Sequence, residues 1–77
     1  MNNTRRKAIE EIQGKISDLR SDLEALRDEE QEYLDNMPES LQSSEKATNA
    51  ENAVSYMEDA INGLEEAENT LTDAVTL

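Results

Sequence analysis

Apolar side chains recur at steps of three and four residues through both halves of this chain, and its single proline separates the halves. In the first half the row consists of Ile9, Ile12, Ile16, Leu19, Leu23, Leu26, Tyr33 and Met37. In the second half it consists of Ala50, Val54, Met57, Ile61, Leu64, Leu71 and Val75. Residues spaced in this way lie on one face of a helix. The pattern therefore predicts two long helices, each with an apolar seam that needs a partner.

The first helix is expected to span about residues 4–36, with Asn3 or Thr4 as its N-cap. Pro38 disfavours helical geometry at the residue before it and ends the helix. A linker is expected at about residues 37–43, with a short turn near its proline.

The second helix is expected to span about residues 44–76. It begins either at Ser44 or at Thr48, because Thr48 and Glu51 have capping-box spacing. The pair Asn62-Gly63 resembles a hairpin turn. We interpret it as helix interior, because the apolar spacing continues through it without a break.

A chain of 77 residues cannot bury much of its own surface and usually depends on cross-links, a metal or a partner subunit. The chain has no Cys to form disulfides and no His to bind a transition metal. The predicted fold is therefore all-α: one domain with two long antiparallel helices, a helical hairpin, that self-associates into a four-helix or larger bundle. The seam and oligomer contacts are assigned to Ile9, Ile12, Ile16, Leu19, Leu23, Leu26, Val54, Met57, Ile61, Leu64 and Leu71.

Charge is distributed unevenly between the two ends of the chain. Residues 1–27 hold six basic and five acidic side chains, a net charge of +1. Residues 28–77 hold one basic and fourteen acidic side chains, a net charge of −13. In an antiparallel hairpin the basic cluster Arg5, Arg6 and Lys7 lies beside Asp73 and the carboxylate of Leu77. Opposite charge thus favours this orientation of the two helices.

Two glutamates fill gaps in the apolar rows, Glu30 in the first and Glu68 in the second. We interpret them as polar residues that set the register of the seam. Glu68 is expected near Lys15 and Arg20, and Glu30 has Arg27 one turn before it.

The second helix also carries a row of small side chains, which recur every seven residues beside the large apolar positions: Ala53, Ala60, Ala67 and Ala74. Small side chains allow another helix to approach closely, so the row predicts a wider buried face on this helix.

The inventory for catalysis is thin, because neither a Cys nucleophile nor a His base is present. We therefore predict a non-enzymatic protein without a cofactor. The acidic run Asp28, Glu29, Glu30, Glu32 and Asp35 lacks the alternating oxygens and the glycine of a calcium loop, so it predicts a solvated helix face and no metal site. A net charge of −12 disfavours nucleic acid as a partner. No apolar run is long enough to span a membrane, so we expect a cytoplasmic protein.

Three short stretches resemble a known group of proteins: residues 27–32 (Arg-Asp-Glu-Glu-Gln-Glu), residues 36–42 (Asn-Met-Pro-Glu-Ser-Leu-Gln) and Ser44-Glu45. They are similar to small acidic helical-hairpin proteins encoded by phages and prophages of Gram-positive bacteria, whose function is generally unassigned. The resemblance covers roughly residues 27–74 and implies a phage origin and a place in the cytoplasm of a bacterial host. It carries over no functional residue.

The leading hypothesis is an interaction protein that self-associates and binds a bacterial host protein through an acidic helical surface, as a counter-defence inhibitor. The partner-binding residues are then Asp28, Glu29, Glu32, Asp35, Met37 and Leu41. One alternative is an oligomeric sponge that sequesters a nucleotide immune signal, with its ligand held by Arg5, Arg6, Lys7, Lys15, Arg20, Tyr33 and Tyr56. A second alternative is a structural or assembly protein.

Overall fold

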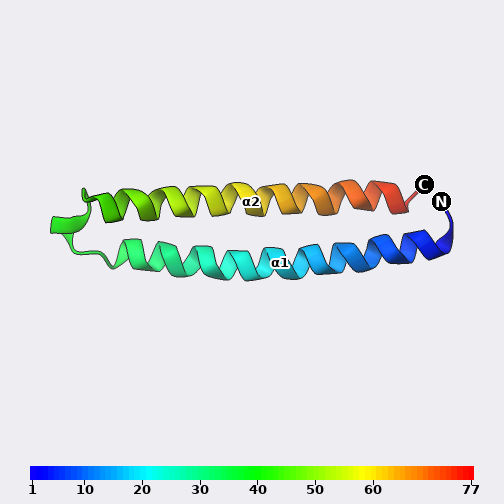
Figure 1. Cartoon of the computed structure of the whole chain (residues 1–77), viewed down its shortest axis with the longest axis horizontal. Coiled ribbons are helices and arrows are strands. Elements are labelled where there is room, and N and C mark those ends of the chain that lie inside the picture. Colours follow the sequence, from blue (N-terminus) through cyan, green and yellow to red (C-terminus); the bar gives the residue numbers. More distant parts are fainter.

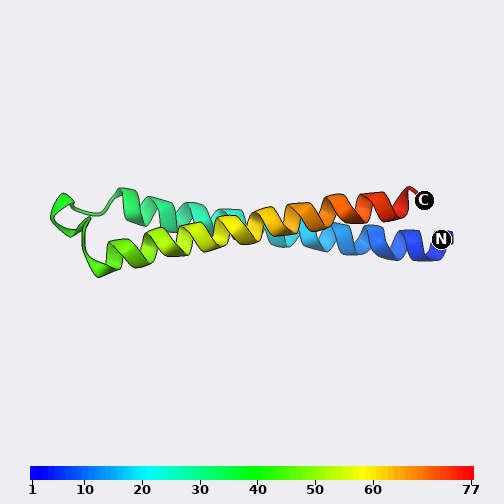
Figure 2. The ribbon, with the colours of Figure 1, turned by 90° about the horizontal axis from the view of Figure 1, so that it is seen from above.

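The computed structural model describes residues 1–77 and shows a helical hairpin. Helix α1 spans Asn3–Asp35, the 3-10 helix η1 spans Glu39–Leu41 and helix α2 spans Glu45–Val75. The two long helices run antiparallel and pack along their whole length, with both termini at one end and η1 at the other (Figures 1 and 2). The Cα atoms extend over 59 × 14 × 12 Å. The predicted all-α hairpin is confirmed, and its helix boundaries agree with the expected ones to within one residue.

The N-cap of α1 is Asn2, whose side chain accepts a hydrogen bond of 2.8 Å from the backbone N–H of Arg5. The expected caps, Asn3 and Thr4, were wrong, because both already belong to the helix. The extended backbone of Asn2 aims its side-chain oxygen at the free N–H groups of the first turn. The helix therefore begins one residue earlier than expected.

Helix α2 begins after Ser44, whose hydroxyl accepts a hydrogen bond of 3.3 Å from the backbone N–H of Ala47. The alternative start at Thr48 was wrong: Thr48 lies inside the helix, where its hydroxyl donates to the carbonyl of Ser44. Asn62 and Gly63 lie within α2, as expected. Between the helices, Pro38 precedes η1 and accepts a hydrogen bond of 2.8 Å from the backbone N–H of Leu41, which closes the short turn.

The apolar row of α2 forms its side of the hairpin interface. Four residues of α2 are buried: Ala47, Ala50, Val54 and Ile61. Four more are partly shielded at the same spacing: Met57, Leu64, Leu71 and Val75. The large apolar side chains that are shielded on this helix thus all belong to the row that the sequence pattern identifies.

Helix α1 uses a different row. Its shielded seam residues also recur at steps of three and four, but polar side chains alternate with apolar ones: Arg6, Ile9, Gln13, Ile16, Arg20, Leu23, Arg27, Glu30, Leu34 and, just beyond the helix, Met37. In contrast, Ile12 is 48% exposed, Leu19 58% and Leu26 54%. The prediction that these three residues lie in one seam with Ile9, Ile16 and Leu23 was wrong for the hairpin itself, because the seam turns half of the apolar stripe of α1 outward.

The interior of the hairpin is thin. Only five residues are buried, and none of the large side chains is fully enclosed. Two helices shield only a narrow strip of each other, so a hairpin of this size buries too little apolar surface to be more than marginally stable alone. Neither helix combines the length and apolar content needed to cross a bilayer.

Ile61 tests where the interior lies, because it is the largest buried side chain of α2, with 5% exposure. We expect Ile61→Ala to lower the free energy of unfolding by about 2 kcal/mol, the low end for such truncations, since the thin core can relax around the gap. The exposed Asp59 provides the matched control, and Asp59→Ala should change it by less than about 0.5 kcal/mol. Urea unfolding followed by circular dichroism measures both. Equal effects of the two substitutions would contradict this packing.

Candidate functional site

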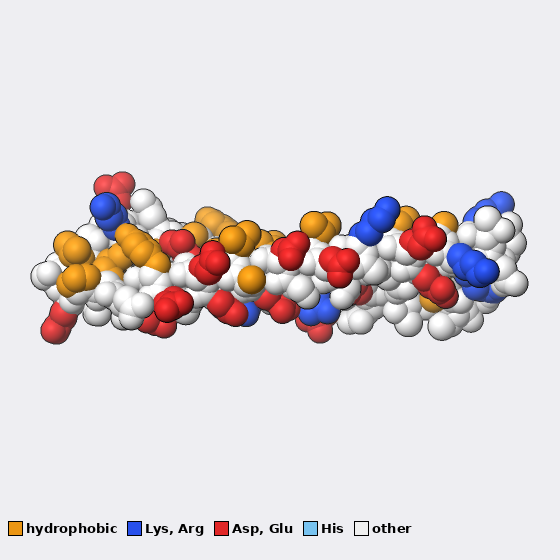
Figure 3. Space-filling view, turned by 90° about the horizontal axis from the view of Figure 1, so that it is seen from below, with side chains coloured by type: hydrophobic (Ala, Val, Ile, Leu, Met, Phe, Trp, Pro, Cys, Tyr) orange, Lys and Arg blue, Asp and Glu red, His pale blue; other side chains and the backbone are white.

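The seam divides the surface of the hairpin into two flanks of opposite character. The seam residues of each helix come in pairs, with three residues from the first to the second member and four residues to the next pair. In an antiparallel helix pair, the residues directly before each pair lie together on one side of the seam, and the residues directly after each pair lie together on the other side. On the first side lie Ile12, Leu19, Leu26 and Tyr33 of α1 and Ala53, Ala60, Ala67 and Ala74 of α2. We call this surface the apolar flank. In Figure 3 apolar side chains recur along one long edge of the molecule, with carboxylates beside them.

The opposite side, the polar flank, consists of Glu10, Ser17, Glu24 and Gln31 of α1 and Glu51, Glu58, Glu65 and Thr72 of α2. Side chains from the seam reach toward it and bridge the helices. The side-chain amide of Gln13 donates to the Thr72 hydroxyl at 2.9 Å and to the Glu68 carbonyl at 3.0 Å. The polar groups of this flank can therefore bond with water and with each other, whereas the side chains of the apolar flank have no apolar partner in the hairpin.

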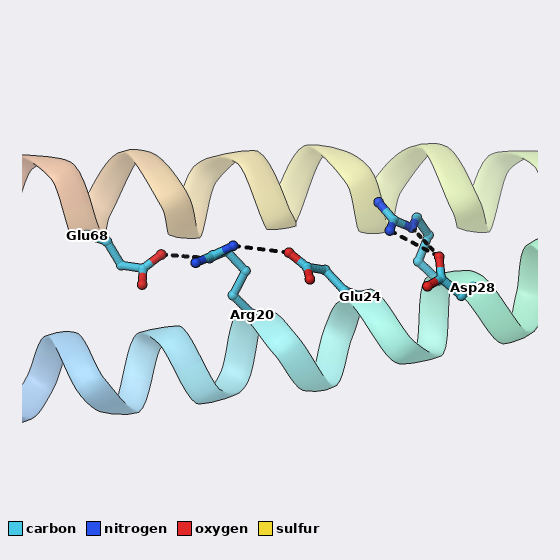
Figure 4. A network of polar contacts seen from close by, with 5 residues as sticks. Arg20, Glu24, Asp28 and Glu68 are labelled. Carbon is cyan, nitrogen blue, oxygen red and sulfur yellow. Dashed lines mark hydrogen bonds and ion pairs between the residues drawn. The ribbon is translucent and has the colours of Figure 1, made fainter.

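Arg20 and Glu68 form the main ion pair across the seam (Figure 4). Arg20 Nε lies 2.7 Å from Glu68 Oε2, and Arg20 Nη1 lies 3.1 Å from Glu24 Oε1. The hydrogen bond that Arg20 donates to the Glu68 carboxylate raises the pKa of the Arg20 guanidinium above its ordinary value, so the cation persists at any physiological pH. The expected contact of Glu68 with Arg20 is confirmed, while Lys15, the other expected neighbour, forms no ion pair.

Glu30 occupies a partly shielded seam position, but its expected partner was wrong. Arg27 turns to Asp28 instead, with Nη2 and Nε each 3.0 Å from Asp28 Oδ1. Arg27 is itself a seam residue, so its guanidinium must leave the narrow interface toward the nearest exposed carboxylate. Long side chains commonly place their apolar stem in an interface and their charge in water in this way.

At the end that carries the termini, Arg6 ties the two helices together. Its Nε donates to the Val75 carbonyl at 3.2 Å and its Nη2 to the backbone oxygen of Leu77 at 2.6 Å. Of the three basic side chains that were expected to be neutralised by the end of α2, only Arg6 therefore contacts that end. Asp73, also expected to contribute, forms no ion pair, and Arg5 and Lys7 stay exposed.

A hollow of about 300 Å³ lies at the opposite end, where α1 meets the linker. We call it the loop hollow; it is lined by Tyr33, Asn36, Met37, Pro38, Leu41 and Lys46. Met37, assigned to the partner-binding surface, is only 8% exposed and forms the floor of this end of the hairpin, whereas Leu41 is 46% exposed. A second hollow nearby, of about 330 Å³, is acidic and lined by Leu34, Asp35, Gln42 and Glu51.

The six predicted partner-binding residues lie within the last turns of α1 and the linker. The four carboxylates, Asp28, Glu29, Glu32 and Asp35, are all exposed. Two of them have polar neighbours: Arg27 pairs with Asp28, and the Gln31 amide donates to Asp35 at 2.8 Å. The structure therefore places an acidic surface on the last turns of α1. Of its four carboxylates Asp35 lines the second hollow, while Met37 and Leu41 line the loop hollow.

The residues of the nucleotide-sponge hypothesis do not gather in one chain. Arg5, Arg6 and Lys7 lie at the terminal end, while Tyr33 lies at the linker end, which a helical rise of 1.5 Å per residue puts about 40 Å away. Lys15 and the ion-paired Arg20 lie between them, and Tyr56 is 74% exposed on α2.

No group of three or more acidic side chains is arranged to hold a metal ion. The features that the surface presents are exposed carboxylates, an apolar hollow and an apolar flank. Comparison of the chain with known protein families, with curated proteins and with solved structures finds no match.

Sequence reasoning missed the polar members of the α1 seam. Arg6, Gln13, Arg20 and Arg27 recur every seven residues, and each is followed three residues later by an apolar or seam residue. That heptad spacing could have identified these residues as seam positions. It did not single them out, because the exposed apolar residues of α1 recur with the same period.

Glu68 tests how a charge in the seam affects stability. We expect Glu68→Leu to raise the melting temperature by roughly 3–8 °C for a domain of this size, because it continues the apolar row from Leu64 to Leu71 and leaves Arg20 paired with Glu24. Glu66→Leu, an exposed position on the outer face of α2, is the control and should leave it nearly unchanged. A lower melting temperature for Glu68→Leu would show that the ion pair stabilises the hairpin more than an apolar contact does.

Proposed function

We propose that this protein is a non-enzymatic interaction protein: a self-associating helical hairpin that binds a bacterial host protein through the acidic surface at its linker end. The observation that carries the proposal is the row of exposed carboxylates Asp28, Glu29, Glu32 and Asp35 on the last turns of α1, which lead into the residues that line the loop hollow. With the phage resemblance of residues 27–74, the proposed purpose is inhibition of a host defence component in the bacterial cytoplasm.

The two parts of this surface supply different contributions to binding. Clustered carboxylates attract a basic partner over distances comparable with the Debye length and raise the association rate. The loop hollow offers an apolar lining and one cation, Lys46, in which a single anchoring side chain of the partner would be desolvated. We therefore expect a partner with a basic surface around one protruding apolar side chain.

The remaining hypotheses have less support in the arrangement of side chains. A nucleotide sponge needs its cations and aromatic rings close together, and in one chain they lie at opposite ends. A structural role needs a partner surface too, and nothing on the hairpin distinguishes a virion component from another protein. The acidic surface suits a basic partner, and the phage resemblance of residues 27–74 favours a host protein.

We expect neutralisation of the acidic surface to abolish capture of a host protein. The variant carries Asp28→Asn, Glu29→Gln, Glu32→Gln and Asp35→Asn. A matched control removes four charges from exposed positions of α2, through Glu58→Gln, Asp59→Asn, Glu65→Gln and Glu66→Gln. Both variants have the same net charge, so any difference between them reflects position. Pull-down from a host lysate, with quantitative mass spectrometry, measures the recovery of each captured protein.

The proposal predicts that wild type and control capture the same protein, that the first variant captures at least about 30-fold less of it, as for loss of an interface hot spot, and that raising the salt concentration weakens capture. Equal capture by both variants, or capture that high salt leaves undiminished, would contradict an electrostatic contact at this site.

A further inference from the structure

The apolar flank is left uncovered by the hairpin. Ile12, Leu19, Leu26 and Tyr33 are between 45% and 58% exposed, although they lie within the regular part of α1. Across the seam, Ala60 is exposed, and Ala53, Ala67 and Ala74 are only partly shielded. One continuous flank thus presents a row of large apolar side chains beside a row of small ones.

This flank has the spacing of a second seam. On α2, residues at steps of three and four run along it without an acidic side chain: Asn49, Ala53, Tyr56, Ala60, Gly63, Ala67, Thr70 and Ala74. On α1 the corresponding row is Ala8, Ile12, Lys15, Leu19, Asp22, Leu26, Glu29 and Tyr33. Nineteen acidic residues in a chain of 77 make such an acid-free row on α2 notable, since half of the exposed positions elsewhere on α2 carry carboxylates. Two rows of this kind are what another helix pair requires for packing.

The flank is also complementary to itself. The bond between Gln13 and Thr72 shows that Ile12 lies roughly level with Ala74, and by the same register Tyr33 lies level with Ala53. The large row and the alanine row therefore share one midpoint along the hairpin, between Leu19 and Leu26 on α1. A two-fold axis through that midpoint places the flank of one copy on the identical flank of another, as a symmetric dimer interface requires.

Charge selects between the two ways of stacking such flanks. With the linkers at opposite ends, α1 packs antiparallel on α1 of the second copy, and Lys15 of each copy lies opposite Glu29 of the other. These two attractive pairs flank one like-charge contact, Asp22 against Asp22 on the two-fold axis. The exposed Arg5 and Lys7 then approach the acidic linker end of the second copy, near its Asp35. With the linkers at the same end, Lys15 meets the uncharged Thr70 of the second copy and the two acidic ends repel each other.

The area of the flank suffices for a dimer. Helices of 33 and 31 residues, with a rise of 1.5 Å per residue, give a face about 45 Å long. The hairpin is 14 Å wide, so the footprint is about 600 Å² per copy, at the lower end of the range for specific interfaces.

We propose that the apolar flank binds a second copy of this chain, with the two linkers at opposite ends, to form an antiparallel four-helix bundle. This inference deepens the self-association within the proposed function: it assigns the contact to one flank and gives the orientation of the copies. Its test uses the purified chain alone, so its failure is distinguishable from failure to capture a host protein.

Sedimentation equilibrium over a concentration series tests the contact. The wild-type chain should reach twice its mass of 8.7 kDa. The double variant Leu19→Gln and Leu26→Gln, which keeps good helix formers, should weaken the dimer at least about 100-fold. The control Glu58→Gln and Glu65→Gln, on the polar flank, should leave the dissociation constant within about 3-fold, a change of less than 1 kcal/mol by the same relation. A wild-type chain that stays monomeric, or equal weakening by both double variants, would overturn the proposal.

Two further variants test the orientation without touching the apolar residues. Asp22 lies on the proposed two-fold axis opposite its own copy, and the chain has no native Cys. Asp22→Cys should therefore form a disulfide-linked dimer under mild oxidation, while the control Asp18→Cys, on the outer face of α1, should not. Lys15→Glu alone should weaken the dimer more than the equally charged control Ser55→Glu with Asn62→Glu, at exposed positions of α2 outside the flank, and adding Glu29→Lys should restore it. A dimer in which the Asp22→Cys variant fails to cross-link and the charge reversals have no effect would overturn the head-to-tail orientation.

Discussion

The position of the hairpin seam relative to the apolar stripe of α1 governs the rest of this structure. When two helices pack together, each shields only two positions per heptad of the other. The stripe of α1 occupies three positions per heptad: the two seam positions, one of them mostly polar, and the position of Ile12, Leu19 and Leu26. The seam shields Ile9, Ile16 and Leu23 together with the polar row that begins at Arg6 and Gln13. It leaves Ile12, Leu19 and Leu26 in solvent. The division of the surface into an apolar and a polar flank follows from this offset.

The polar residues that the offset brings into the seam hold the register of the two helices. Gln13 reaches Thr72 and the Glu68 carbonyl, Arg20 reaches Glu68, and Arg6 binds the backbone at the end of α2. All these bonds use long side chains whose stems cover the seam while their heads reach its edge. A register shifted by one turn would lose the bonds and leave Glu68 unpaired in a narrow apolar strip, at a cost in free energy. Directional bonds thus compensate for a core of only five buried residues.

Much of the fold could be predicted from the sequence, because its determinants are local. The two rows of apolar residues, Pro38 and Ser44 are sufficient to place both helices to within one residue of their observed bounds. The face of α1 that meets α2 could not be predicted in the same way, because both candidate rows have the same period. Counting apolar residues favours the row with Ile12 and Leu19, and only the three-dimensional pairing of Arg20 with Glu68 selects the other. The burial of Met37, by contrast, follows from its place at the end of the apolar row.

The two flanks and the linker end assign different tasks to different parts of a small molecule. The apolar flank is suited to a second copy. In the head-to-tail dimer Glu29 lies in the contact between copies, whereas the exposed Asp28 and Glu32 face outward at each end of the bundle. Isotope-filtered nuclear Overhauser spectroscopy on a mixture of labelled and unlabelled chains tests the offset most directly. The account predicts that the Leu23 methyl groups contact α2 of the same chain, whereas those of Leu19 and Leu26 give contacts only between copies. Strong contacts of Leu19 and Leu26 with α2 of their own chain would contradict it.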